Sequence, residues 1–197
     1  MALPPLPELL VADAAAWRAW LTDHHAASPG VWLVLTKKGG DVTALGYEDA
    51  VRQALCFGWI DGQGRSRDAA TSLQRFTPRR ARSRWSALNV RRVGELEQAG
   101  LMTPAGAAQV AAAQADGRWD AAYEGPAATT VPDDLAAALA ANPDAQAMFD
   151  VLTSSNRFAI VYRITSVKRA ETRARNIAKY VDMLARGETI YPQKRRP

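Results

Sequence analysis

The chain has 197 residues, of which 48% are hydrophobic, and a formal net charge of +5. This length and composition are sufficient for a substantial buried core, which excludes a protein that is disordered throughout. No apolar run reaches the roughly 18 residues that a membrane-spanning helix needs, and the start lacks the features of a signal peptide, so we expect a cytoplasmic protein. The only cysteine, Cys56, fits a reducing compartment and is expected to be a small buried side chain.

The first predicted elements are a helix, a strand and a second helix. Asp13 is a suitable N-cap for a helix that ends before Ser28, because apolar residues follow it at helical spacing. Residues 31–36 are mostly β-branched, aromatic and aliphatic and lie between turn signals, which predicts a central strand. Residues 47–57 repeat apolar side chains on one face, and Gly58 is placed to end this helix.

A hairpin is predicted next. Residues 59–67 and 72–77 form two extended segments joined around 68–71, and Pro78 closes the second segment. The dipeptide at 61–62, Asp-Gly, is an alternative tight turn, so the register of the hairpin stays open.

The rest of the chain is predicted to be helical. Ser83 is a good N-cap for a helix that ends at Gly100, with Leu88 on its apolar face. Residues 125–130 are small and predict a loop, and the basic tail 191–197 is expected to be flexible. Further helices are predicted over 103–116 and 132–141, from Pro143, from Ser154 or Ser155, and over 168–186.

These elements predict an α+β fold, with helices around a short antiparallel or mixed sheet in the N-terminal half and an all-helical C-terminal half. We expect an α+β lobe over 1–100 with an arginine-rich loop, a helical lobe over 101–190 and a flexible tail, together forming one compact unit. Neither a glycine-rich dinucleotide fingerprint nor a P-loop is present in the sequence.

One stretch of the chain is unusually rich in arginine. Between residues 52 and 92 there are ten arginines, no lysine and only two acidic residues. Guanidinium is planar, permanently charged and suited to two-pronged hydrogen bonds with phosphate or carboxylate, so this choice predicts anion recognition. The ten are Arg52, Arg65, Arg67, Arg75, Arg79, Arg80, Arg82, Arg84, Arg91 and Arg92.

The candidate site lies where this stretch enters the helical half. If Ser83 starts a helix, the free backbone N–H groups of its first turn point at the loop that holds Thr77, Arg79 and Arg80. Such a helix start, walled by guanidinium groups, would accept a phosphate or a carboxylate.

Other residues complete this candidate site. Ser86 and Asn89 share a helix face, and Trp85 is placed to lie under a planar ligand or a guanidinium. Asp61 is a candidate catalytic acid or base, and the late helix offers a second source of cations, with Glu171 as an ion-pair partner. The predicted ligand-binding residues are Trp59, Asp61, Arg75, Thr77, Arg79, Arg80, Ser83, Trp85, Ser86, Asn89, Lys168 and Arg173.

Each candidate also has a structural interpretation. The arginines of the loop could cover the surface or pair with Asp133 and Asp134, and the two tryptophans could be core residues. Asp61 could serve the turn before Gly62, and the charges of the late helix could pair along that helix. No spacing predicts a metal site, and no cofactor is expected.

A set of short motifs is spread along the chain, at 30–33, 37–38, 54–62, 75–80, Ser83, 85–86, Asn89, 100–102, 116–119, 122–123, 132–135 and 168–173. Together these motifs resemble the YdeI/OmpD-associated, or bacteriocin-protection, family (OmdA). They occur in the expected order along nearly the whole chain, and the one departure is Val167, where such proteins usually have alanine before the lysine. The resemblance implies an association with bacteriocin tolerance and envelope stress and does not imply a reaction.

The leading functional hypothesis is therefore a cytoplasmic anion-binding accessory protein of stress or envelope resistance, with a small phosphorylated or carboxylated ligand. A nucleic-acid-binding protein is the first alternative, with arginines on phosphates and aromatic side chains on bases. An enzyme of acyl or phosphoryl chemistry that uses Asp61 is the second, and it lacks an identifiable nucleophile and base. The third alternative is a protein whose function is only to bind another protein.

Overall fold

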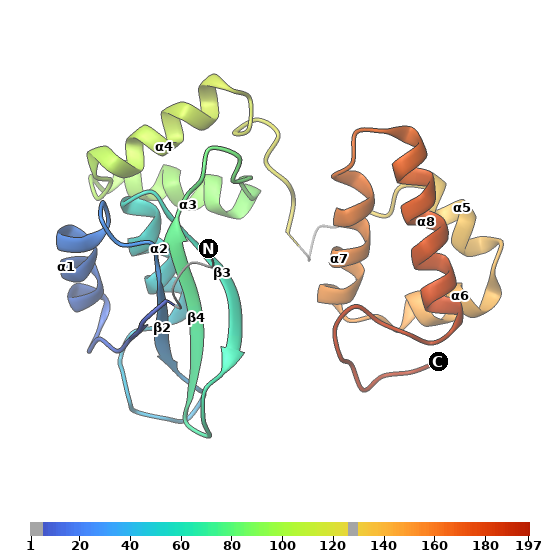
Figure 1. Cartoon of the computed structure of the whole chain (residues 1–197), viewed down its shortest axis with the longest axis horizontal. Helices are drawn as coiled ribbons and strands as arrows, with labels where there is room; N and C mark the ends of the chain where they lie inside the picture. The colour runs from blue at the N-terminus through green and yellow to red at the C-terminus, as the bar shows by residue number, and fades with distance from the viewer. Residues whose placement is uncertain (1–5, 126–129) are drawn as a thin grey trace, which may run out of the picture. The chain divides into compact units, whose positions relative to one another are not determined.

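The structure, a computed structural model, describes residues 6–125 and 130–197. Most of the loop predicted at 125–130 therefore lies outside the described residues. The chain divides into two compact units, Met1–Tyr123 and Glu124–Pro197. In the described residues, the first unit combines a sheet with helices, and the second contains helices without strands (Figure 1). The α+β class and the all-helical C-terminal half predicted from the sequence are confirmed.

The sheet of the first unit is mixed, with strand order β1-β2-β4-β3. Strand β1 pairs in parallel with β2, and the pairs β2–β4 and β3–β4 are antiparallel. The hairpin turn lies between β3 and β4, so Asp61 and Gly62 are inside a strand, and a shift in register follows Asp61. The two-residue β1 was not predicted. The strands are β1 Glu8–Leu9, β2 Val31–Thr36, β3 Trp59–Ser66 and β4 Thr71–Pro78.

Helix α1 (Ala14–His24) and helix α2 (Tyr47–Cys56) supply much of the core of the first unit. Asp13 caps α1 as predicted, because its carboxylate accepts a hydrogen bond from Ala16 N at 2.9 Å. Trp17 is fully buried, and its indole N–H donates to Ala50 O of α2 at 3.1 Å. Burial of such a side chain stabilises the fold by about 1.5–3 kcal/mol. Cys56 is also fully buried, as expected.

Trp59 is a core residue of the same cluster. It is 1% exposed and packs edge-on against Trp17 and Trp20, at centroid distances of 6.3 and 5.8 Å. Its indole N–H donates to His25 O at 3.1 Å. Both the ring and the N–H of Trp59 are thus occupied, which favours the structural interpretation of this tryptophan.

Helix α3 (Ala87–Gln98) begins later than predicted. Its N-cap is Ser86, whose hydroxyl accepts a hydrogen bond from Asn89 N at 3.2 Å. Ser83 closes a turn instead, because its hydroxyl accepts from Arg80 N at 2.9 Å. With this later start Leu88 falls in the first turn of the helix and is 43% exposed, rather than lying on the apolar face.

Helix α4 (Pro104–Ala115) belongs to the first unit, so the boundary between the units lies later than the position near residue 100 expected from the sequence. The helix begins at its predicted N-cap, Thr103, whose hydroxyl also donates to Cys56 O at 2.6 Å. Gly106 lies so close to α2 that a Cβ atom there would be 2.2 Å from Cys56 O. This close approach joins α4 to α2.

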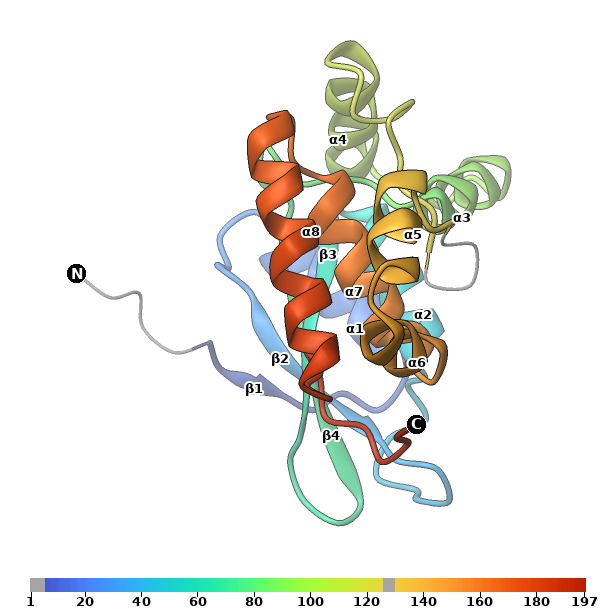
Figure 2. The same ribbon diagram turned by 90° about the vertical axis from the view of Figure 1, so that its right-hand side faces the viewer.

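The second unit is a cluster of helices around its own core. Leu135, Leu139, Ile160 and Leu184 are among its buried side chains, and Figure 2 shows α5 and α8 side by side. No helix in the described ranges is long and apolar enough to cross a membrane. The helices are α5 Asp133–Ala140, α6 Pro143–Asp150, α7 Ser154–Thr165 and α8 Ala170–Ala185.

The first residues of the C-terminal tail are bound to the second unit. Asn156 is fully buried, and its side chain donates to Tyr191 O at 3.0 Å and accepts from Tyr191 N at 2.8 Å. The same amide donates to Gln193 Oε1 at 2.9 Å. The part of the tail up to Gln193, expected to be flexible, is therefore held by hydrogen bonds.

Candidate functional site

Several of the ten clustered arginines serve separate contacts across the first unit. Some form ion pairs: Arg52 with Glu95, Arg67 with Glu8 and Arg92 with Glu48. Arg65 instead crosses β4 and lies 4.3 Å from the centre of the Trp32 ring on β2. These arginines do not converge, because each of them is engaged with a different partner.

Arg79 differs from these arginines, because part of its buried guanidinium has no partner. It follows the last residue of β4, and its backbone N–H donates to Gly58 O at 3.0 Å. The residue is 6% exposed, and its guanidinium lies 3.5 Å from the centre of the Trp85 ring. Its Nη1 donates to Arg84 O at 3.2 Å, whereas Nε and Nη2 are buried and have no partner. Arg79 is thus a buried cation with an unused hydrogen-bonding edge.

Trp85 is held by the chain on both of its sides. It precedes the N-cap Ser86, and its carbonyl accepts a hydrogen bond from Tyr123 N at 3.1 Å. Trp119 packs against the Trp85 ring at 4.9 Å with an interplanar angle of 62°. The Trp85 side chain is 1% exposed, and its indole Nε1 has no hydrogen-bond partner. Trp85 therefore supplies a rigid aromatic surface for Arg79 and one further unused donor.

A second guanidinium, that of Arg118, lies near the first. Arg118 Nε is 2.8 Å from both carboxylate oxygens of Asp116, and Nη1 donates to Ser83 O at 2.9 Å. Arg79 and Arg118 thus bind the carbonyls of two adjacent residues, Ser83 and Arg84. We refer to Arg79, Trp85 and Arg118 as the Arg79 site.

The charge of Arg79 is destabilised by its surroundings. Burial lowers the pKa of Arg79 to about 10, and the positive charge of Arg118 acts in the same direction. The negative charge of the Asp61 carboxylate acts in the opposite direction. Near neutral pH the guanidinium nevertheless remains charged, since a pKa of about 10 is well above 7.

The unused atoms of the Arg79 site are all donors. Within residues 6–125 and 130–197, the buried side-chain polar atoms without a partner are Arg79 Nε, Arg79 Nη2 and Trp85 Nε1. Buried polar groups are normally paired, so this concentration is unusual. All three atoms are hydrogen-bond donors, so each of them needs an acceptor.

Asp61 of β3 is hydrogen-bonded to helix α2. Its Oδ2 accepts a hydrogen bond from the Tyr47 hydroxyl at 2.7 Å, and in the described residues this is its one side-chain hydrogen bond. Burial and this hydrogen bond raise the pKa of Tyr47, although 45% of the residue's surface is exposed. Tyr47 therefore remains a neutral donor well above physiological pH.

The predicted anion site at a helix starting with Ser83 is not formed, because that helix begins at Ala87. Two N–H groups of its first turn are already used, since Ala87 N donates to Tyr123 O and Asn89 N to Ser86 Oγ. The Asn89 amide oxygen accepts from Arg92 Nη1 at 2.7 Å. Ser86 and Asn89 thus act as a cap and as part of the contact between helices.

The remaining candidates of the first unit lie on β4 and just after it. Arg75 and Thr77 are half-buried residues of β4, opposite Trp32 and Ile60 respectively. Arg80 is exposed. Arg80 therefore lies beside Arg79 in sequence but outside the buried site, which makes it a useful control.

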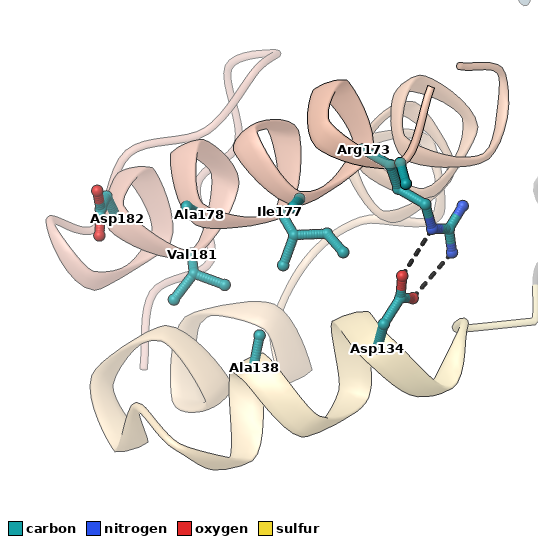
Figure 3. A pocket seen from close by; sticks show the side chains of 9 residues that line it. Asp134, Ala138, Arg173, Ile177, Ala178, Val181 and Asp182 are labelled. Atoms are coloured by element: carbon teal, nitrogen blue, oxygen red, sulfur yellow. Dashed lines mark hydrogen bonds and ion pairs between the residues drawn. The ribbon is translucent and has the colours of Figure 1, made fainter. Parts of the chain in front are cut away.

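Lys168 and Arg173 belong to the second unit. Lys168 is exposed and precedes α8. Arg173 does not pair with Glu171 as expected, because its Nε and Nη2 bind both carboxylate oxygens of Asp134 on α5 at 2.6 and 2.8 Å (Figure 3). This pair lies at one end of a groove of about 410 Å³ between α5 and α8, and Ile177 is among its apolar lining residues.

Sequence reasoning missed Arg118, which belongs to the Arg79 site, and Tyr47, which is the partner of Asp61. Arg118 lies in the segment 116–119, which was used only as a sign of family resemblance. The available signal was the sequence Asp116-Gly117-Arg118-Trp119, which places an arginine beside a tryptophan outside the basic stretch. No pattern in the sequence pointed to Tyr47, because its partner Asp61 lies on a different element.

The fold and this site define a protein of two units, an α+β unit with a buried arginine site and a helical unit. Residues 9–109, about half of the chain, match the model of a domain of unknown function, DUF8412, and the chain belongs to that family. Residues 128–187, in the second unit, match the bacteriocin-protection, YdeI or OmpD-associated family (OmdA), which confirms the predicted resemblance. No curated protein and no solved structure is significantly similar to the chain.

Proposed function

We propose that the protein binds a small carboxylate or phosphate anion at the Arg79 site. The observation that carries this proposal is the unpartnered Nε–Nη2 edge of Arg79, a residue that is 6% exposed. These two N–H groups point in parallel and match two oxygens of a carboxylate or phosphate. The proposal keeps the anionic ligand predicted from the sequence and replaces the helix N-terminus by a buried guanidinium.

Other arginines of the chain support the choice of ligand. The same edge, Nε and Nη2, binds the carboxylate of Glu48 in Arg92, of Asp134 in Arg173 and of Glu188 in Arg186. Arg79 is more buried than Arg173 and presents this edge to no side chain. A ligand carboxylate or phosphate would complete the arrangement that the chain itself uses elsewhere.

Energetics favour occupation of the site. A buried donor without an acceptor costs about 1–3 kcal/mol, and a hydrogen bond to a charged group contributes about 1.5–3 kcal/mol. The nearby charge of Arg118 adds a repulsion that an anion would offset. Because Trp85 and the carbonyl of Arg84 already fix the guanidinium, an anion loses little affinity to ordering of the side chain.

In biological terms, we propose a cytoplasmic accessory protein linked to bacteriocin protection or envelope stress. The support for this is the match of residues 128–187 to the bacteriocin-protection family, together with the single, fully buried Cys56, which needs no oxidising compartment.

The experiment is a measurement of the melting temperature with inorganic phosphate, propionate and short oligonucleotides, each at low and high salt. Binding to the native state raises Tm by mass action, by about 2–4 °C for each kcal/mol in a protein of this size. We expect a salt-tolerant increase with phosphate or propionate that is lost in Arg79→Met and retained in Arg80→Met. An increase only with oligonucleotides, abolished by salt, would contradict the proposal and support the nucleic-acid alternative.

A second variant separates binding from folding. Arg79→Lys keeps a positive charge on a flexible stem and removes the planar edge. If the bidentate contact is correct, this variant folds and binds the anion at least about tenfold more weakly. Unchanged affinity in Arg79→Lys would show that only charge matters, which contradicts the bidentate model.

A further inference from the structure

One face of the sheet in the first unit carries arginines around a tryptophan. Trp32 of β2 lies directly opposite Arg75 of β4, and Arg65 of β3 lies opposite Leu73 of β4. Directly opposite residues share a face, as do residues two positions apart on a strand, so these four side chains lie on the same face. The other face, with Phe76, belongs to the core that α1 and α2 build, and neither Trp32 nor Leu73 is part of that core. We refer to the face with Trp32, Arg65, Leu73 and Arg75 as the Trp32 face.

The guanidinium groups of Arg65 and Arg75 have no carboxylate partner among the residues that the structure describes. The central carbon of the Arg65 guanidinium lies 4.3 Å from the centre of the Trp32 ring, and Arg65 is exposed. Arg75 is half-buried and lies directly across from Trp32. Arg67, by contrast, is bound to Glu8 at 2.8 Å. Arg65 and Arg75 therefore present their hydrogen-bonding edges to solvent or to a ligand.

Two lysines extend this positive surface at the end of β2. The Nζ atom of Lys37 donates to Ser66 Oγ at 2.9 Å, and Ser66 directly follows Arg65. Lys37 and Lys38 line a hollow of about 280 Å³ at this end of the sheet. Lys37 lies five positions after Trp32, or about 17 Å along the strand. The cations therefore extend over a length that suits several linked phosphates rather than one small anion.

Two acidic residues lie beside the Trp32 face, and both are engaged within the protein. Glu8 is paired with Trp32 in the register of β1 and β2, and its carboxylate accepts from Arg67 Nε at 2.8 Å. Asp68 of the hairpin turn accepts from the backbone N–H and the hydroxyl of Thr71, both at 2.7 Å. Because these carboxylates are used elsewhere, the unpaired arginines of the Trp32 face favour an anionic partner.

We propose that the Trp32 face binds single-stranded nucleic acid. A base would stack on the Arg65 guanidinium above the Trp32 ring, because the bases of single strands stack on aromatic side chains and on guanidinium planes. Arg75 and the two lysines at the end of β2 would bind the phosphates. An acidic segment of a protein would match the charges alone, whereas a nucleic acid matches both the charges and the aromatic stack.

The test is fluorescence anisotropy of the full chain with labelled oligothymidylate and oligouridylate of about 12 nucleotides, at several salt concentrations. About four phosphate contacts predict a log–log slope of affinity against salt of about −3. Arg65→Met, Arg75→Met and Trp32→Leu should each weaken binding. The loss in Trp32→Leu should be about tenfold or more, because this variant removes the base of the stack. Arg80→Met changes an exposed arginine that follows β4, and as the matched control it should change binding little.

Polyphosphate and polyglutamate, titrated in the same way, separate stacking from charge. We expect Trp32→Leu to weaken binding of the oligonucleotides and to leave binding of polyphosphate unchanged. The inference is overturned if Arg65→Met, a change of an exposed side chain, binds the oligonucleotides as the wild type does, or if every variant affects oligonucleotides and polyphosphate alike. Tighter binding of polyglutamate than of the oligonucleotides would also overturn it and would indicate an acidic protein partner.

This inference does not depend on the Arg79 site. The Arg79 guanidinium packs on Trp85, which belongs to the core and not to the Trp32 face. Arg79→Met should therefore keep the affinity for oligonucleotides while it loses the response to small anions. Loss of oligonucleotide binding in a folded Arg79→Met variant would overturn the inference, whereas failure of the Trp32 face to bind leaves the small-anion proposal standing.

Discussion

The guanidinium of Arg79 lies 3.5 Å from the centre of the Trp85 ring, and both side chains are buried. A stack of this kind stabilises the cation through the face of the ring, by about 2 kcal/mol where water is excluded. It does not satisfy the N–H groups at the edge of the guanidinium, and two of these remain unpartnered. The contact therefore holds the cation in place while leaving its hydrogen-bonding edge available.

Replacement of Arg79 by methionine is expected to change the stability of the ligand-free protein little or to increase it. The substitution removes two unsatisfied donors and a buried charge, and such replacements are neutral or stabilising by about 1–4 kcal/mol. The stacking with Trp85 is lost, which offsets part of this gain. The free energy of unfolding from urea denaturation measures the balance.

The matched control for this measurement is Arg80→Met, since Arg80 is exposed and outside the site. We expect it to shift the free energy of unfolding by less than about 0.5 kcal/mol. A loss of more than about 3 kcal/mol in Arg79→Met would mean that Arg79 holds the fold together, and the reading of its free edge as a ligand site would be wrong.

Two glycines should respond in opposite directions to substitution by alanine. At Gly106 of α4 a Cβ atom would lie 2.2 Å from Cys56 O, so Gly106→Ala must separate α4 from α2. We expect a loss of stability of about 1–3 kcal/mol from this overpacking. At Gly94 of α3 no atom lies within 4 Å of the new Cβ, so Gly94→Ala should stabilise the helix by about 0.5–1 kcal/mol. Thermal unfolding compares the two variants, and equal effects would contradict the close packing of α4 on α2.

Acid should weaken the contact between α2 and α3 through Glu48. Hydrogen bonds from Arg92 hold the pKa of Glu48 below its ordinary value of 4.5. The unfolded chain then binds the proton more readily, so this stabilisation is present above about pH 4.5 and is lost as the pH falls through the lower folded value. In Glu48→Gln, stability should depend less on pH in this window. A pH profile identical to that of the wild type would show that the pair contributes nothing.

Base should reveal the contact between Tyr47 and Asp61. Burial, then the hydrogen bond to Asp61, raise the pKa of Tyr47 above its ordinary value of 10.0. The stabilisation from neutral Tyr47 is therefore present below pH 10 and is lost as the pH rises through the higher folded value. Tyrosinate absorbance, compared between wild type and Tyr47→Phe, isolates this group among the five tyrosines. In Asp61→Asn the transition should move towards its ordinary value, and no movement would argue against the hydrogen bond.

In the second unit, the pair of Arg173 and Asp134 should contribute modestly. Its side chains are 28% and 45% exposed, so solvent screens the attraction despite the two-pronged geometry. A double-mutant cycle with Arg173→Ala and Asp134→Ala should give a coupling of about 0.2–1 kcal/mol. Zero coupling would mean that the pair does not help to join α8 to α5.

Local patterns predicted the elements of this fold well and the site only in part. The N-caps Asp13 and Thr103, the central strand and the hairpin follow from signals within a few residues. Ser83 was misplaced as a cap because Ser86 offers the same chemistry three residues later, and pairing of Ser86 with Tyr123 decides between them. The sequence around Ser83 and Ser86 contains no information about that pairing, because Tyr123 lies more than thirty residues further along the chain.

The site illustrates the same limit. The sequence predicted that arginines of this stretch bind an anion, and that prediction treated Arg79 and the exposed Arg80 alike. Only the three-dimensional arrangement distinguishes them, because it places Trp85 under one of the two guanidinium groups. Arg118 likewise approaches from a distant part of the sequence, after helix α4.

The most direct test of anion binding at Arg79 is a proton–nitrogen NMR titration that follows the Arg79 Nε–H and Trp85 indole N–H signals as phosphate or lactate is added. We predict that the Arg79 signal shifts strongly and saturably, at salt concentrations that screen surface charges, while the signals of exposed arginines such as Arg80 do not move. Saturable binding that leaves the Arg79 and Trp85 signals unchanged would contradict the account, because the anion would then lie elsewhere.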